Sequence, residues 1–139
     1  MTDETKQQRF DAVSLALLKA IPDVWAIYAY GSMVNGTEHD GSDLDLGVLM
    51  PPGKRIPDLL TLKASLSELA GREVDLADLR KAGNVLRREV LAKGVELYSA
   101  QRVQTLAWEA VAMSEYADHQ FRIRDLLSDF NRTGIGYRQ

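Results

Sequence analysis

The chain of 139 residues is 45% hydrophobic and 27% charged, a composition that fits an ordinary folded domain and excludes a disordered or low-complexity chain. It has no cysteine, so disulfides, zinc–thiolate sites and thiol catalysis are excluded. Its formal net charge of −3 argues against nonspecific binding to nucleic acid, which needs a basic surface to neutralise phosphates.

The polar N-terminus and the lack of a long apolar run predict neither a targeting signal nor a membrane span. We therefore expect a cytoplasmic protein with one domain over residues 1–139. The core should lie at about residues 1–100 and a C-terminal helix at about residues 101–130.

The first predicted element is an amphipathic helix over residues 4–20, closed by Pro22. Its apolar side chains recur at helical spacing: Phe10, Val13, Leu17 and Ile21. The short apolar and aromatic stretch at residues 24–30 predicts a buried strand.

The next predicted strand, at residues 43–49, follows a long polar loop and opens with two aspartates. Since side chains i and i+2 of a strand project from the same face, Asp43 and Asp45 should lie side by side. Carboxylates this close repel each other unless a cation lies between them, and a divalent metal is the usual one. Gly31 and Ser32 end the preceding strand and offer bare backbone and a hydroxyl that can hold an anion. This arrangement indicates nucleotide chemistry.

A helix is predicted at residues 57–71, with Gly71 as its C-terminal cap. The alternating stretch at residues 73–79 predicts a third strand that turns the Asp75 side chain outward, as a third carboxylate. Asp78 lies three residues further on, and we favour Asp75 because it stands between two inward apolar residues.

Residues 82–92 predict a short helix whose apolar residues are Val85, Leu86 and Val90, and residues 95–98 predict an edge strand. Together these elements predict an α+β fold: a small mixed, mainly antiparallel sheet flanked by helices, with a long C-terminal helix.

That last helix should be unbroken over residues 101–130, because no proline or glycine interrupts it. It carries two apolar stripes. The first comprises Val103, Leu106, Ala110, Met113 and Ala117, and the second comprises Tyr116, Ile123, Leu127 and Phe130. Two interpretations stay open: the helix bends or breaks and packs on its own sheet, or at least one stripe binds a partner protein.

The pattern of Gly31-Ser32, ten further residues and Asp43-x-Asp45, with Asp75 on a later strand, resembles the signature of the polymerase-beta-like nucleotidyltransferase superfamily. The short chain is similar in particular to the minimal nucleotidyltransferase (MNT) type found as antitoxins in HEPN/MNT toxin–antitoxin pairs. The similarity extends through residues 74–80 and 85–98.

The resemblance implies that Gly31 and Ser32 hold the triphosphate of ATP. It also implies that Asp43 and Asp45 bind Mg²⁺, as two ions, and that Asp75 is a third metal-binding carboxylate that helps to activate the attacking hydroxyl. Two metal ions would neutralise charge on both the attacking and the leaving oxygens.

The favoured hypothesis is an Mg²⁺-dependent protein adenylyltransferase. As an antitoxin, it would transfer AMP from ATP to a tyrosine of a cognate HEPN ribonuclease toxin, neutralise that toxin, and form a hetero-oligomer with it. Two alternatives remain: an antitoxin that acts by binding alone, and a nucleotidyltransferase that acts on a small-molecule hydroxyl. The Arg-to-His motif of HEPN ribonucleases is absent around His39 and His119, so the chain is not the toxin, and both histidines should be surface residues.

Family members place a basic residue after Gly-Ser, where this chain has Met33-Val34-Asn35. The cation that would hold the triphosphate is therefore open, and the candidates are Arg55, Lys63, Arg72 and Arg80.

Overall fold

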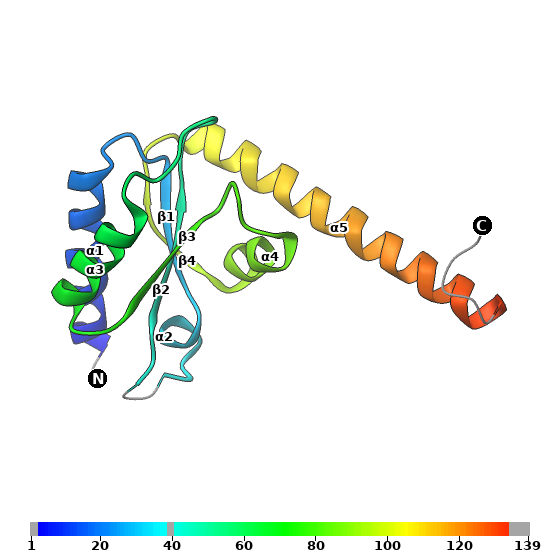
Figure 1. Ribbon diagram of the computed structural model, residues 1–139, viewed down its shortest axis with the longest axis horizontal. Helices are drawn as coiled ribbons and strands as arrows, with labels where there is room; N and C mark the ends of the chain where they lie inside the picture. Colours follow the sequence, from blue (N-terminus) through cyan, green and yellow to red (C-terminus); the bar gives the residue numbers. More distant parts are fainter. Residues whose placement is uncertain (1–2, 39–40, 134–139) are drawn as a thin grey trace.

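The computed structural model describes residues 3–38 and 41–133, and its centre is a four-stranded sheet (Figure 1). The strands are β1 (Ala26–Tyr30), β2 (Leu44–Leu49), β3 (Val74–Asp78) and β4 (Val95–Ser99), in the order β3-β2-β1-β4. The β2–β3 pair is parallel, whereas β1 pairs antiparallel with β2 and with β4. The predicted mixed, mainly antiparallel sheet is therefore confirmed, and β4 is an edge strand as expected.

One face of the sheet packs against α1 (Asp3–Ala20) and α3 (Leu59–Ala70). Leu44 and Leu46 of β2 are fully buried on this face, as the alternation of the strand predicted. The opposite face is covered by α4 (Asn84–Lys93).

The second face holds a smaller cluster that brings β1 against α4. Tyr28, Tyr30 and Leu79 pack there with Val90 of α4. Gly47 of β2 lets Leu79 pack closely on this face, because a Cβ at position 47 would lie only 3.0 Å from a methyl carbon of Leu79.

Two local predictions need comment. Gly71 ends α3 in the left-handed conformation, with φ 68° and its amide donating to the Ser67 carbonyl, so the predicted cap is confirmed. The short helix predicted at residues 82–92 is confirmed as α4, in which Val90 is buried and Val85 is 74% exposed.

The segment predicted as a polar loop after Gly31 begins instead with one helical turn, α2 (Ser32–Asn35). Met33 is buried to 2% exposure, which anchors this turn to the core. The position of His39 lies outside the described residues.

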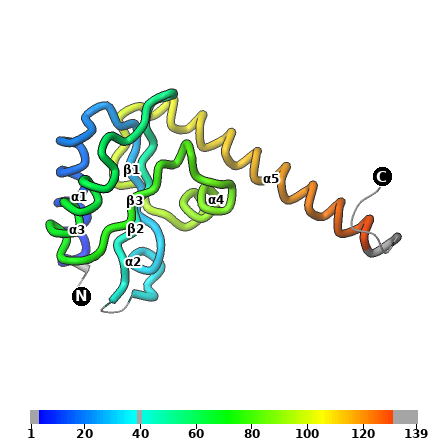
Figure 2. The backbone as a smooth tube through the Cα atoms, viewed as in Figure 1, coloured from blue at the N-terminus to red at the C-terminus, as the bar shows by residue number. Residues whose placement is uncertain are grey.

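The last helix, α5 (Arg102–Thr133), is continuous and leaves the body of the protein instead of folding back on the sheet (Figures 1 and 2). The interpretation that this helix bends or breaks onto its own sheet is therefore wrong. Its buried contacts are Thr105 and Ala112, beside the half-buried Trp108, because small side chains allow a close approach to the neighbouring α4.

Most of the large apolar side chains of α5 are exposed: Val103, Leu106, Val111, Met113, Phe121, Ile123, Leu126, Leu127 and Phe130. Both predicted stripes contribute to this set, so the expectation that at least one stripe lacks an intramolecular partner is confirmed. Along the described chain, no helix has both the length and the apolar character needed to cross a membrane.

Candidate active site

The site lies where the end of β1 meets the beginnings of β2 and β3. Asp45 of β2 is in register with Asp75 of the parallel β3 and with Tyr30 of the antiparallel β1. Asp43 stands one residue before β2 and is exposed, whereas Asp45 is half-buried. Strand alternation and sheet register thus bring the three predicted carboxylates to one corner of the sheet.

Gly31, the residue after β1, completes this corner from the other side. It adopts φ 80°, a conformation that favours glycine. A Cβ at position 31 would collide with Asp45 Oδ2, so the absence of a side chain lets the backbone reach the carboxylate. Ser32 follows as the first residue of α2. The structure therefore places Gly31 against Asp45, with Ser32 as the next residue of the chain.

The electrostatics of the corner follow from this crowding. Burial, repulsion from Asp75 and repulsion from Asp43, in that order, raise the pKa of the Asp45 carboxyl to about 6. Negative charge here is therefore incompletely compensated by the protein itself, and a bound cation would relieve the repulsion.

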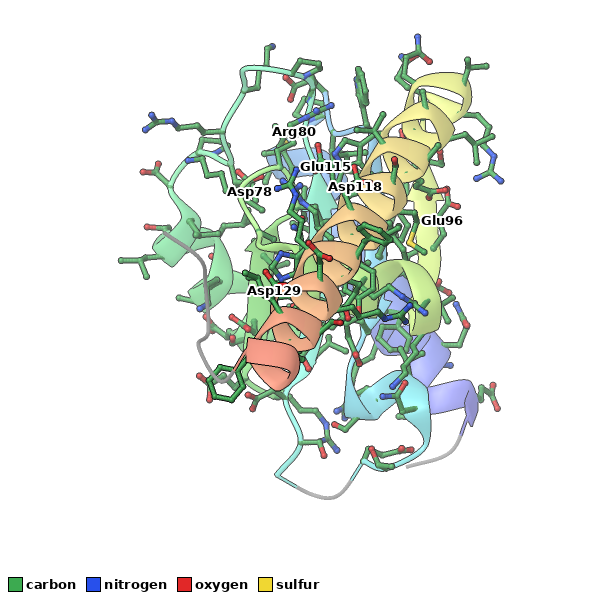
Figure 3. All side chains as sticks on the ribbon, turned by 90° about the vertical axis from the view of Figure 1, so that its right-hand side faces the viewer. Asp78, Arg80, Glu96, Glu115, Asp118 and Asp129 are labelled. Atoms are coloured by element: carbon green, nitrogen blue, oxygen red, sulfur yellow. The ribbon has the colours of Figure 1, made fainter. Side chains whose placement is uncertain are left out.

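Asp78, the alternative to Asp75, has a different environment. It is paired in register with Val48 at the far end of β3, and strand alternation places its side chain on the opposite face from Asp75. Its Oδ1 accepts a hydrogen bond from the backbone amide of Arg80, near which it lies in Figure 3. The structure therefore favours Asp75 as the third carboxylate of the site.

The side chains considered as cations for the triphosphate differ in the groups that they contact. Lys63 Nζ lies 3.3 Å from Asp75 Oδ1. Arg80 Nε donates to the Met50 carbonyl at 2.5 Å, and its guanidinium lies over the Trp25 ring. Arg72 Nη1 donates to the Ser42 carbonyl at 2.9 Å, which holds the chain just before Asp43. Of these three side chains, Lys63 is the one with a described contact to a carboxylate of the site.

Tyr30 lies beside the carboxylates, whereas His119 lies far along the chain on α5. Tyr30, which the sequence reasoning did not single out, faces the carboxylates. Burial raises its pKa to about 12, with Asp45, Asp75 and Glu89 adding to the shift, so its phenol is protonated at neutral pH. The signal was its position directly before Gly31. His119 is exposed on α5, as expected of a surface residue.

Carboxylate oxygens are the donors that Mg²⁺ prefers, so the chemistry of the three aspartates fits that ion. Within residues 3–38 and 41–133, no three acidic or histidine side chains are arranged as a ready metal cage. That is compatible with Mg²⁺, which typically takes one or two carboxylates and completes its shell with substrate phosphates and water.

Comparison with known proteins identifies the class. The family described as "Polymerase beta, Nucleotidyltransferase" matches residues 15–103, a span that contains the whole corner formed by β1, β2 and β3. The chain belongs to this nucleotidyltransferase family.

Individual relatives are more specific. The chain is 32% identical to the protein adenylyltransferase MntA of Shewanella oneidensis over 112 residues, which are 78% of this chain and 81% of that protein. Its fold is similar to a crystal structure of a toxin–antitoxin complex with AMP-PNP, with a TM-score of 0.76, 29% identity, and coverage of 86% of this chain and 96% of that one. It is also similar to a chain in a complex of a tri-AMPylated Shewanella oneidensis HEPN toxin with an MNT antitoxin, with a TM-score of 0.71, 26% identity, and coverage of 89% and 97%.

Proposed function

We propose that this chain is an antitoxin that transfers AMP from ATP to a tyrosine of a cognate HEPN ribonuclease toxin. The observation that carries the proposal is the register of Asp45 with Asp75, beside the bare backbone of Gly31. This is a site for divalent cation and phosphate within a nucleotidyltransferase domain. The likeness to an adenylyltransferase and to HEPN–MNT complexes supports the choice of acceptor and partner.

In the proposed reaction, an acceptor hydroxyl oxygen forms a bond to the α-phosphorus of ATP. The bond from that phosphorus to the oxygen bridging to the β-phosphate breaks, and its electron pair leaves with pyrophosphate. The proton of the acceptor passes to the Asp75 carboxylate and from there to solvent. No covalent enzyme intermediate is needed.

The protein residues divide this work by position. Gly31 and Ser32 bind the triphosphate on the β1 side of Asp45, and Asp75 receives the acceptor on the β3 side. Asp43, Asp45 and Asp75 would hold Mg²⁺, which would supply neutralisation of the charge on the transferred phosphate. Tyr30 borders Asp45 with a protonated phenol that can donate a hydrogen bond.

The partner surface in this proposal is α5, which is apolar along its exposed sides and projects from the body of the domain (Figure 2). Exposed apolar areas of this kind usually mark protein interfaces. In a single nucleotidyltransferase domain over residues 1–139, with its core at about residues 1–100, α5 would then act as a docking helix that presents the acceptor protein to the site, as a hetero-oligomer.

The test is co-expression with a HEPN ribonuclease toxin, followed by intact-mass measurement of that partner. We expect mass increments of whole AMP units that require Mg²⁺ and ATP. Asp43→Asn and Asp45→Asn should abolish them, whereas Asp23→Asn should not, because Asp23 precedes β1 at the opposite end from Gly31 and pairs with Lys54. A stable complex with an unmodified partner would favour inhibition by binding alone. Transfer at the wild-type rate by either site variant would refute the site.

A further inference from the structure

We infer that Lys63 is the acceptor-side cation of this site, a group that contacts the attacking hydroxyl oxygen and stabilises the negative charge that develops on it. This inference rests on the proposed function and assigns to one residue a role in the choice and activation of the acceptor.

The position of Lys63 follows from the packing of α3. This helix packs directly against β3, and the Lys63 side chain reaches from it to the edge of the sheet, where Nζ lies 3.3 Å from Asp75 Oδ1. The side chains of both partners are partly exposed, at 32% and 54%, so an incoming group can reach the pair. The ammonium therefore stands beside the carboxylate that receives the proton of the acceptor in the proposed reaction.

The strand order decides which substrate the ammonium meets. Across the sheet, β2 lies between β3 and β1, so Asp45 separates Asp75 from Gly31. The proposed triphosphate site is on the Gly31 side, and Lys63 is on the Asp75 side. In-line transfer requires the attacking and leaving oxygens to lie on opposite sides of the transferred phosphorus. Lys63 is thus placed with the attacking group and away from the leaving pyrophosphate.

The proposed acceptor, a tyrosine phenol, reacts more readily when a positive charge lies beside its oxygen. A tyrosine phenol has a pKa of about 10 in water and is a weak nucleophile while protonated. A lysine ammonium beside the phenol oxygen favours its anionic form, just as an opposite charge within a few ångströms favours ionisation elsewhere in proteins. The proton of the phenol passes to Asp75, and the positive charge of Lys63 offsets the negative charge on the oxygen as that oxygen bonds to phosphorus.

Two other roles for Lys63 have to be separated from this one. An exposed ion pair can simply be a surface contact that contributes little to stability and nothing to the reaction. Alternatively, the ammonium could leave Asp75 and bind the triphosphate. The first role predicts unchanged transfer on loss of Lys63, and the second predicts weaker ATP binding.

The experiment compares Lys63→Gln, Lys63→Arg and the control Lys54→Gln, using the full chain with the HEPN partner. Lys54 also forms an exposed ion pair, with Asp23 at 2.8 Å, but these residues precede β1 and follow β2, at the opposite end of these strands from Asp45. For each variant we would measure the thermal midpoint, the affinity for a fluorescent ATP analogue with Mg²⁺, and kcat and KM for AMP transfer.

We expect Lys63→Gln to lower kcat about 10²-fold, on the scale of losing one positioned charge at a reacting oxygen. The affinity for the ATP analogue should stay within about twofold of wild type. Loss of a direct ion pair with a phosphate would weaken binding of the analogue by much more than this. Lys63→Arg should recover a large part of the rate, because it retains the positive charge. Lys54→Gln should match wild type in all measurements.

Wild-type transfer by Lys63→Gln would overturn the inference and leave the proposed function intact. A parallel loss of analogue affinity would overturn it in favour of a triphosphate role. Absence of AMP transfer by the wild-type chain, with partner and ATP present, would overturn the proposed function and this inference with it.

Discussion

The backbone of Gly31 lies against the carboxylate of Asp45, so closely that a Cβ at position 31 would collide with Asp45 Oδ2. The two residues belong to different elements, since Gly31 follows β1 and Asp45 lies in β2. The antiparallel pairing of these strands brings them together. The lack of a side chain at position 31 therefore leaves the room that the Asp45 carboxylate occupies.

Replacing Gly31 by Ala should abolish AMP transfer and lower the free energy of unfolding by about 1–3 kcal/mol, since the φ of 80° strains any L residue and the new methyl displaces Asp45. Gly36→Ala is a matched control, because Gly36 has φ 79° but nothing lies within 4 Å of a Cβ built there. It should show the strain without loss of transfer. Chemical denaturation and a transfer assay on both variants check this; equal activity of the two would contradict it.

The apo protein should lose stability as pH rises through the region of the Asp45 titration. The folded pKa is raised from 3.8 to about 6, so the native state binds the proton more tightly than the unfolded state does. The stabilisation by the protonated form is complete below about pH 4 and is lost as pH rises to about 6. After allowance for solvent screening, we expect the free energy of unfolding to fall by about 1 kcal/mol over this pH range, which lowers Tm by a few degrees.

The control for this effect is Asp45→Asn, whose Tm should not follow the same pH trend. The measurement is the difference in Tm between the metal-free wild type and the variant from pH 4 to pH 7. A difference that stays constant over this range would contradict the assignment. Mg²⁺ should bind the wild type less tightly at pH 5 than at pH 7, because it competes with the proton.

An aspartate placed on the exposed side of α5 should weaken partner binding without unfolding the domain. Leu126→Asp is suited to this because Leu126 is 48% exposed, whereas Ala112→Asp would bury a charge at a position that is 3% exposed. We expect the free energy of unfolding to change by less than about 0.5 kcal/mol for the first and to fall by about 3 kcal/mol or more for the second. Thermal unfolding and pull-down of the HEPN partner distinguish them. Intact partner binding by Leu126→Asp would remove this part of α5 from the proposed interface.

Arg87 should be a stabilising residue that lysine cannot replace. Its guanidinium donates to the carbonyls of Leu79 and Arg80 at 2.9 and 2.6 Å and to Glu115 of α5 at 3.2 Å, and so joins three segments. Arg87→Lys should cost about 1–3 kcal/mol, since an ammonium cannot reproduce this fork of donors.

The neighbouring Arg88 offers the control. It lies over the Tyr116 ring at 5.6 Å, so Arg88→Lys keeps a cation at the ring and should cost less than about 1 kcal/mol. Chemical denaturation of both variants makes the comparison. A loss for Arg88→Lys as large as that for Arg87→Lys would contradict the role given to the guanidinium fork.

The sequence by itself determined the elements and the residues of the central motif. Periods of 3.6 and 2 are local properties, so the four longer helices and the four strands were found within a few residues, and Asp43 and Asp45 had to share a side. The same alternation turned Asp75 outward. These inferences needed no knowledge of which strand pairs with which.

The tertiary structure alone decided the remainder, because strand register and helix packing depend on contacts between distant residues. The parallel pairing of β2 with β3 puts Asp75 beside Asp45, and the packing of α3 on β3 brings Lys63 to that pair. The course of α5 likewise depended on its small buried residues meeting α4, which periodicity of the large side chains could not reveal.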